Sequence, residues 1–482
     1  MAVFLALCRP AAAEELTLSG LFEIVGDDHP MMRQEELSTE IARKSREMAL
    51  AARSWTIRSS PYYYYSRPVE PSSFTPEEMQ ELVVAGSAGK SFWSTGGRFS
   101  VEWSSKLTDQ ELPGITIPSP AGMSSFSLGL NEFYRNRIFL SYSQPLWRNF
   151  GGSLDRLEYD LGGYLVDMSG LEAAENREAF LLRLGMIFID WVLLAEKEGI
   201  LEERLRLARE ELGFVEEKRE AFLVDPVDVL RAEDAVRMAE QNLTLLRSNL
   251  TAARVRLAEL TLSPGIAGMT PRHPLYETSE LPDSAEVFAD IRRGSRRLSA
   301  LRQQKLRLQR LRRGYSERSK PELDLGLGAG LIGGDGRFHD SFTMTEPEYR
   351  ISLIFSWPLG GRAAEIGESR TLVEIRRIDL RHEHAVQELR SGLSDILVRI
   401  GEMEEILRIN RSQIESAGRR MEEEQKMYRQ GRGQLNFVIQ SRDNLQNAKL
   451  IYAENAAAYQ RLLLRYRELT DRIIERPADD GN

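Results

Sequence analysis

Four long stretches of the sequence carry apolar residues at alternating spacings of three and four. The first runs from Phe180 to Phe222, and the others run from Val229 to Leu260, from Val386 to Tyr428 and from Leu445 to Ile473. Such a heptad seam is typical of helices that pack side by side along their whole length. We therefore predict long helices over residues 153–222, 227–262, 360–429 and 435–474.

Alternating apolar and polar residues precede each pair of long helices. Ile138, Leu140 and Tyr142 alternate with polar residues in the first half, and segments 323–331 and 351–357 do so in the second. This period of two is typical of strands with two different faces. We predict strands within residues 61–146 and at 321–332 and 348–358. The Pro-, Gly- and Ser-rich stretches 66–97 and 105–124 are predicted to be loops, and residues 17–57 and 283–314 to be helical.

The strands of both halves end in the same short motif. Pro145 and Leu146 precede the pair Gly151 and Gly152, and Pro358 and Leu359 precede the pair Gly360 and Gly361. Proline ends a strand ladder because it has no N–H, and glycine accommodates a sharp bend. We interpret both motifs as strand-to-helix junctions. The chain would then contain two tandem repeats of helix, strands and two long helices, over 14–265 and 281–474, with a C-terminal tail at 475–482.

The predicted helices and strands together suggest a membrane protein. At about 1.5 Å per residue the longest helices reach about 100 Å, so each needs neighbours along its length. The strands have one apolar face and one face of Ser, Gly, Asp and Glu, which fits lipid on one side and a water-filled lumen on the other. Closing a barrel takes at least about eight strands, so copies of the chain would share one. A soluble coiled-coil scaffold with a β insert is the alternative.

Aromatic side chains of the predicted strands are candidates for contact with lipid or its interface. They are Tyr62, Trp103, Tyr142, Phe355 and Trp357.

The composition narrows the classes of function. A net charge of −9 argues against a nucleic-acid partner. The single cysteine, Cys8, excludes a disulfide within one chain and a Cys-based metal site. His382 and His384 lie on different sides of a helix, which disfavours paired metal ligation. No Ser/His/Asp set, phosphate loop or metal-ligand spacing stands out, so we predict neither an enzyme nor a cofactor.

The first thirteen residues resemble the end of a targeting signal. A short apolar run, Val3 to Leu7, is followed by three alanines that suit signal peptidase. Because the run is short and no Lys or Arg precedes it, we interpret 1–13 as a signal-peptide remnant whose true start lies upstream. The alternative is lipid attachment at Cys8. The sequence contains no run of about 18 apolar residues, so no transmembrane helix is predicted.

Four segments, in order, resemble the TolC-like outer membrane efflux proteins, over roughly residues 15–474. They are the opening stretch from "LSGLFEIVGDDHP" to "SSPYY", "LSYSQPLWRNFGG", "LIFSWPLGGRAAEI" and the final "YRQGRGQLNFVIQSRDNLQ" turn and helix. The resemblance implies a homotrimer in which each chain gives four strands to one twelve-stranded outer-membrane β-barrel, which continues into a periplasmic α-helical coiled-coil tunnel. Residues 59–136 exceed the family's usual strand-loop-strand, which suggests an extra hairpin or a long surface loop.

The resemblance also implies a function. The protein would be a passive, gated export duct in the outer membrane with a large periplasmic part. A periplasmic adaptor (membrane fusion) protein would join it to an inner-membrane RND or ABC transporter. Small-molecule efflux and type I protein secretion both stay open.

The resemblance places the gate at the two helix turns, 222–232 and 428–440. The candidates are Asp225, Asp228, Gly431, Phe437 and Gln440. Asp228 matches the first acidic position of the family's tip. Phe437 and Gln440 stand where some relatives carry an aspartate ring, so the constriction would be aromatic and amide in character. The alternatives are helix N-capping for Asp225 and inter-helix packing for Phe437.

Overall fold

The computed structural model describes residues 14–67, 69, 76–111, 115–119, 122–126, 132–357 and 362–474. The chain forms two compact units. The first comprises residues up to 39, 169–301 and from 381 onward, and the second comprises 40–168 and 302–380. Each unit therefore draws on both halves of the sequence. The predicted signal remnant 1–13, the junction residues Pro358 to Gly361 and the tail 475–482 lie outside the described residues.

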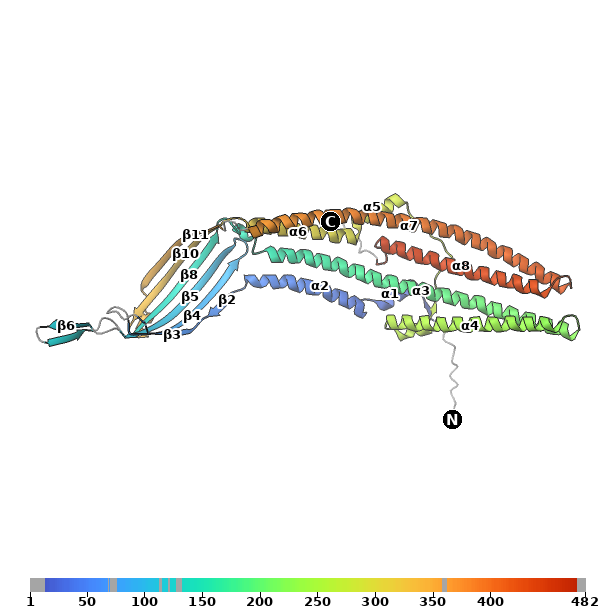
Figure 1. Ribbon diagram of the computed structural model, residues 1–482, viewed down its shortest axis with the longest axis horizontal. Coiled ribbons are helices and arrows are strands. Elements are labelled where there is room, and N and C mark those ends of the chain that lie inside the picture. Colours follow the sequence, from blue (N-terminus) through green and yellow to red (C-terminus); the bar gives the residue numbers. More distant parts are fainter. Residues whose placement is uncertain are drawn as a thin grey trace, which may run out of the picture. The chain divides into compact units, whose positions relative to one another are not determined.

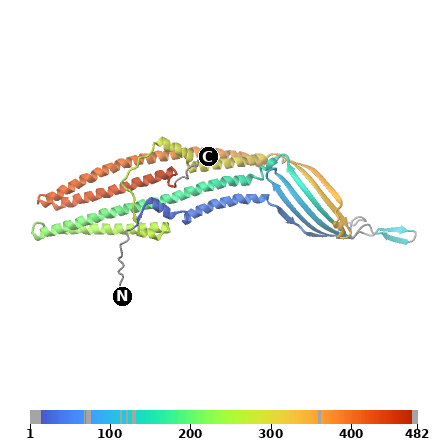
Figure 2. The same ribbon diagram turned by 180° about the vertical axis from the view of Figure 1, so that it is seen from behind.

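The first unit is helical. It contains α1 (Leu18–Val25), α4 (Pro226–Leu260), α5 (Ser284–Gly294), α8 (Leu435–Leu469) and the larger parts of α3 (Leu157–Glu220) and α7 (Arg362–Arg429). Figures 1 and 2 show α3 beside α4 and α7 beside α8, so the long helices form two helical hairpins. None of the described helices is apolar over a stretch long enough to cross a membrane.

The seams of these helices form the core of the first unit. Leu184 and Trp191 of α3, Leu257 of α4 and Tyr459 of α8 are completely buried, and all belong to one cluster with Leu393 and Ile400 of α7. Burial of these apolar surfaces along the helices stabilises the hairpins against each other.

Two predicted helices are each divided in two. The segment predicted as helical over 17–57 contains α1 and α2 (Pro30–Ala49), because Gly26 ends α1 with a φ of 47°. A short 3-10 helix (Leu50–Arg53) follows, and the chain is extended from Thr56. The stretch predicted over 283–314 is α5 and α6 (Arg296–Arg318), separated by the extended residue Ser295. A short parallel pair, β1 (Glu15–Leu16) with β9 (Thr270–Pro271), ties the start of the described chain to the connection between the halves.

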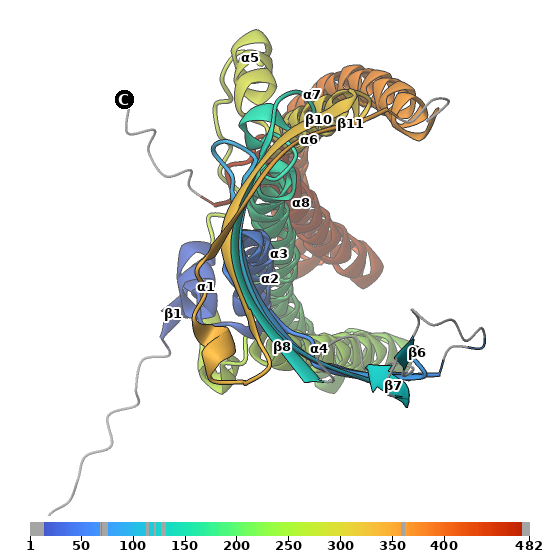
Figure 3. The same cartoon turned by 90° about the vertical axis from the view of Figure 1, so that its left-hand side faces the viewer.

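The second unit contains an antiparallel sheet that is curved in the end-on view (Figure 3). Its strands are β2 (Thr56–Ser59), β3 (Tyr62–Ser66), β4 (Glu78–Phe92), β5 (Gly97–Glu111), β8 (Glu132–Pro145), β10 (Glu322–Asp335) and β11 (Glu346–Ser356). Their order is β11-β10-β8-β5-β4-β2, and β3 also pairs with β4. A separate hairpin consists of β6 (Ile115–Ser119) and β7 (Gly122–Phe126).

The prediction of loops over 66–97 and 105–124 was wrong. Residues 78–92 form β4, β5 extends to Glu111, and β6 lies at 115–119. Strand β4 contains the sequence "AGSAGKS", whose small residues resemble a loop in composition. In the structure, each of the fifteen residues of β4 pairs with a residue of β5. The extra hairpin suggested by the length of 59–136 is therefore present as β4 and β5.

The edge strand of this sheet is interrupted once. Thr56 to Ser59 pair with Gly89 to Gly86, and Tyr62 to Ser66 pair with Val83 to Met79. Both segments keep the same register along β4, and only Ser60 and Pro61 separate them. We therefore treat β2 and β3 as one edge strand, β2/β3. The described residues then give the sheet six strand positions in one chain, where the resemblance implied four.

Candidate gate at the helix tips

The turn between α3 and α4 has a non-glycine residue in the left-handed conformation. Phe222 has a φ of 60°, and the amide of Leu223 donates to the carbonyl of Lys218 at 2.9 Å. This 6→1 hydrogen bond is typical of the Schellman motif at a helix C-terminus, in which the left-handed residue is usually glycine. Asp225 then occupies the N-cap position of α4, but its side chain makes no capping hydrogen bond. Asp228, in the first turn of α4, pairs with Arg231 at 3.2 Å.

The turn between α7 and α8 has the same capping motif, with glycine in the left-handed position. Gly431 has a φ of 74°, and the amide of Arg432 donates to the carbonyl of Met427 at 2.9 Å. Gln434 is the N-cap residue of α8, also without a side-chain capping bond. Phe437 and Gln440 follow in α8, and both are exposed.

An apolar cluster packs the two tips together. Its buried members are Val215, Ala232, Tyr428, Leu435 and Val438, which come from α3, α4, α7 and α8. The Tyr428 and Phe214 rings meet edge to face with centroids 5.8 Å apart. The two helical hairpins are therefore joined at their tips within a single chain.

Lys218 lies against this cluster. Its ammonium group is 3.8 Å from the centroid of the Tyr428 ring and 4.7 Å from that of Phe214, and it donates to the carbonyl of Tyr428 at 3.3 Å. Burial lowers the pKa of Lys218 and raises the pKa of Tyr428. The hydroxyl of Tyr428 is buried and has no hydrogen-bond partner among the described residues. The Lys218 ammonium group thus joins the end of α3 to the end of α7 by cation–π contacts with Tyr428 and Phe214 and by a hydrogen bond to the Tyr428 carbonyl.

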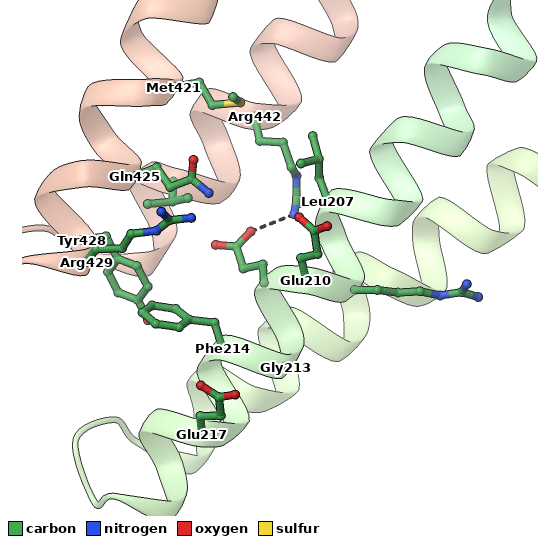
Figure 4. A pocket seen from close by; sticks show the side chains of 13 residues that line it. Leu207, Glu210, Gly213, Phe214, Glu217, Met421, Gln425, Tyr428, Arg429 and Arg442 are labelled. Atoms are coloured by element: carbon green, nitrogen blue, oxygen red, sulfur yellow. Dashed lines mark hydrogen bonds and ion pairs between the residues drawn. The ribbon is translucent and has the colours of Figure 1, made fainter.

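A buried ion pair lies deeper between the hairpins. Arg442 of α8 donates to Glu211 of α3 at 2.8 Å, and their side chains are only 6% and 11% exposed (Figure 4). The pair borders a cleft of about 420 Å³ that is also lined by Phe214, Met421 and Tyr428. Burial raises the pKa of Glu211 to about 7, and the opposing attraction of Arg442 offsets this only in part. Glu211 therefore changes charge near neutral pH.

The predicted gate residues surround this buried cluster but do not form it. Asp225, Phe437 and Gln440 are exposed, and Asp228 is half-buried. A second hollow between the tips is lined by Asp225, Asp228 and Gly431, together with Lys218 and Tyr428.

Lys218, Glu211 and Arg442 were not predicted from the sequence. Phe222, predicted as the last residue of the first apolar seam, is instead an exposed turn residue. One signal was available: the seam of α8 extends backward from Leu445 through positions 442, 438 and 435, so Arg442 is a charge at a seam position. In the described part of the chain, no group of three His, Cys, Asp or Glu residues could hold a metal ion.

The first strand-to-helix junction packs tightly against the turn between β4 and β5. Pro145 ends β8, and the amide of Leu146 donates to the carbonyl of Leu323 at 2.7 Å. Gly151 and Gly152 have φ values of 72° and 68°. The amide of Gly151 donates to the carbonyl of Thr95, and a Cβ on Gly152 would lie 1.9 Å from the carbonyl oxygen of Trp93. Backbone conformation and space therefore both require glycine at 152.

The predicted lipid-facing aromatics do not all lie on one face. The strand register puts Trp103 opposite Ile138, Tyr142 opposite Leu327, and Phe355 opposite Leu323, all on the apolar face. Trp357 follows the end of β11 and is exposed. Tyr62 pairs with Val83, which places it on the opposite face from Tyr63 and Tyr65.

Solved structures of outer membrane channels share this fold. VceC from Vibrio cholerae is 11% identical, with a TM-score of 0.66 over 94% of this chain and 95% of that one. The channel OprN is 14% identical, with a TM-score of 0.66 over 94% and 89%. The open MtrE channel of Neisseria gonorrhoeae is 14% identical, with a TM-score of 0.61 over 94% and 88%. No protein-family model matches the sequence, and no curated protein is significantly similar to it. At these identities the structural matches establish the fold, and the resemblance to TolC-like channels is confirmed at that level.

Proposed function

We propose that this protein is a subunit of a homotrimeric export channel in the outer membrane, with a large periplasmic part. It conducts its cargo passively. An inner-membrane transporter, of the RND or the ABC class, supplies the energy, and a periplasmic adaptor protein joins the two. Both small-molecule efflux and type I protein secretion fit such a duct. The fold shared with outer membrane channels supports this proposal.

The observation that carries the proposal is one apolar row that crosses the whole sheet. Directly opposed residues across the six strand positions are, in order, Ile57, Ala88, Val101, Leu140, Ala329 and Tyr349. The neighbouring row, one residue away, is Thr56, Gly89, Ser100, Ser141, Gly328 and Arg350. At the level of these two rows, one face of the sheet is therefore apolar from edge to edge, and the other is small or polar.

The apolar face remains uncovered in the protomer. Ile351 is 80% exposed, and Leu140, Leu327, Leu353 and Trp103 are also exposed. Soluble monomers rarely leave a contiguous apolar patch larger than a few hundred Å² in water. A sheet with this alternation is suited to a barrel wall, with acyl chains on one side and water on the other.

The polar face carries the interactions expected beside a water-filled lumen. Arg137 pairs with Glu348 at 2.7 Å across Gly330, the Ser100 and Ser141 hydroxyls are 2.7 Å apart, and Lys106 pairs with Glu81. The serine pair and the Lys106–Glu81 pair link neighbouring strands, whereas Arg137 and Glu348 link β8 to β11 across β10. They select little between cargoes, because both signs of charge are present.

The helix tips are the proposed gate. Opening requires the two helical hairpins to move relative to each other. The contacts that oppose this motion in one chain are the cluster around Tyr428, Lys218 against its ring, and the pair between Glu211 and Arg442. In this proposal, Asp228, Phe437 and Gln440 line the narrow end at which copies of the chain meet.

Single-channel recording in planar bilayers tests the proposal. We expect the detergent-purified protein to insert as a trimer with a small, mostly closed conductance. Asp228→Asn and Phe437→Ala should enlarge that conductance, whereas Glu405→Gln, an exposed change within α7, should leave it unaltered. A protein that needs no detergent and never inserts would overturn the channel proposal and favour the soluble coiled-coil scaffold.

A further inference from the structure

The hairpin of β4 and β5 lies inside the sheet, between its two outer parts. Strand β5 pairs with β8 over twelve residues, and β4 pairs with the edge strand β2/β3. Without this hairpin, β2/β3 would be the strand beside β8. The sheet is therefore widened from within, by two strands of fifteen residues each.

The hairpin carries the same two faces as the rest of the sheet. On β4 and β5 the members of the apolar face include Leu82, Val84, Val101, Trp103 and Leu107. On the other face, Glu81 and Lys106 form an ion pair, and Ser100 bonds to Ser141 of β8. A hairpin folded onto the surface of a completed sheet would not need to keep this alternation in register with its neighbours.

The turn of the hairpin is built into the strand-to-helix junction. Gly96 has a φ of 76°, and a Cβ there would lie 2.3 Å from the carbonyl oxygen of Asn149. Gln144 donates its amide to the carbonyl of Thr95 at 2.9 Å, and Trp93, which is buried, packs against Tyr159 of α3. Contacts on both sides of this turn thus fix the hairpin where the chain leaves the sheet.

The two outer edges of the sheet can join between copies. All five pairings along the sheet are antiparallel, so β11 and β2/β3 run in opposite directions. Among the described residues, β11 pairs only with β10, and β2/β3 pairs only with β4. Copies related by rotation would therefore meet as antiparallel neighbours, as a closed barrel requires.

The edges themselves are suited to such a meeting. The side chains of β11 are mostly exposed, including Tyr349, Ile351 and Leu353, and a long apolar edge left open promotes aggregation. The amide of Ser60 donates to Ala85 of β4, so Pro61 faces outward. A neighbouring copy would lose one ladder bond at Pro61 and keep those along Tyr62–Ser66.

We infer that each copy gives six strands to the shared barrel wall, so that a trimer closes eighteen strands in place of twelve. This inference rests on the proposed trimeric channel. Because barrel diameter grows roughly linearly with strand number, the lumen within the membrane is about 1.5 times as wide as that of a twelve-stranded barrel. The hairpin of β4 and β5 contacts lipid on one face and the lumen on the other.

Site-directed fluorescence quenching tests this inference. Single-cysteine variants Ala88→Cys on β4 and Ala329→Cys on β10, made together with Cys8→Ser, belong to the same apolar row and carry the same chemical change. Ser87→Cys, next to Ala88 but on the polar face, is the control. Each variant is labelled with bimane and reconstituted in phosphatidylcholine vesicles in which part of the lipid carries a nitroxide on its acyl chain. Iodide is the aqueous quencher, and Val101→Cys replaces Ala88→Cys if that variant fails to assemble.

We expect the labels at 88 and 329 to lose fluorescence to the nitroxide lipid by the same factor, and the label at 87 to respond only to iodide. Quenching at 329 without quenching at 88 would place the hairpin outside the wall and overturn the eighteen-stranded barrel, while the channel itself would stand. Absence of lipid quenching at all three positions would overturn the membrane channel and this inference with it.

Discussion

Removing the buried cation at the helix tips tests how the gate is held. Arg442→Met leaves Glu211 with no cation at hydrogen-bond distance in a site where both side chains are about nine-tenths buried. The comparison is made above pH 7, where Glu211 carries its charge. For charge centres about 4 Å apart and an effective dielectric constant of about 20, the attraction lost there is about 4 kcal/mol. Breaking a buried pair from one side costs about 3–5 kcal/mol, which agrees with this value.

Amide hydrogen exchange measures this cost locally. We expect peptides covering 207–217 and 435–446 of Arg442→Met to exchange more than about a hundredfold faster than in the wild type, since each 1.4 kcal/mol is about a factor of ten. Arg206→Met is the matched control, because Arg206 is half-exposed and, among the described residues, forms ion pairs only with Glu203 and Glu210 of its own helix. In that control, the free energy of opening derived from amide exchange should change by less than about 1 kcal/mol.

A double variant separates the charge from the shape of the site. Glu211→Leu with Arg442→Met removes both charges and fills the space with apolar atoms, so most of the lost protection should return. If Arg442→Met and Arg206→Met had equal effects, the buried pair would not hold the hairpins together, and the reasoning would be refuted.

Three further predictions concern pH, turn geometry and the junction. Burial raises the pKa of the Glu211 carboxyl to about 7. The resulting contribution to tip stability is complete at pH values below 4.5, the ordinary pKa of glutamate, and is lost as pH rises through about 7. Amide exchange of the tip peptides should become faster over this pH range, and Glu211→Gln should remove the pH dependence. Phe222→Gly should stabilise the first tip by about 1 kcal/mol, because a residue with a Cβ is strained at a φ of 60°. Gly431→Ala should destabilise the second tip by a similar amount, because position 431 has a φ of 74°. The midpoint temperatures of thermal unfolding of the two variants should shift in opposite directions. Gly152→Ala should abolish assembly, measured as the yield of trimer, because the new methyl group would overlap the carbonyl oxygen of Trp93. The methyl group of Gly151→Ala would meet no atom within 4 Å, so this variant should lose only about 1–2 kcal/mol of stability, from the φ of 72° at that position.

The long helices could be predicted because their packing repeats along the sequence. A residue such as Trp191 or Leu257 is buried by neighbours at fixed spacing, so the pattern alone identifies the buried face. Strand β4 gave no such signal. Its "AGSAGKS" segment has little hydrophobic contrast between its faces, and the strand is stabilised by pairing with β5 and β2/β3, which composition does not encode.

The centre of the candidate gate escaped prediction for a related reason. Turn residues such as Asp225 and Gly431 are marked by their type, since capping and left-handed backbone favour particular amino acids. Glu211, Lys218 and Tyr428 acquire their importance only when two helical hairpins distant in sequence meet, and nothing local distinguishes them from other charged or aromatic residues of a heptad. Arg442 also escaped prediction, although its sequence position carried a local signal, because an arginine within an apolar seam requires a buried partner.

Insertion of a whole hairpin explains how the sheet could widen without altering the helices that flank it. Two antiparallel strands return the chain to the end from which it started, so β8 keeps the direction it would have beside β2/β3. One inserted strand would reverse β8 and carry Pro145 to the other end of the sheet, away from the start of α3. An even number of strands per copy also keeps β11 and β2/β3 antiparallel, so closure between copies survives the change. Strand number can therefore increase by twos, and the tip contacts of Glu211, Tyr428 and Arg442 need not change with it.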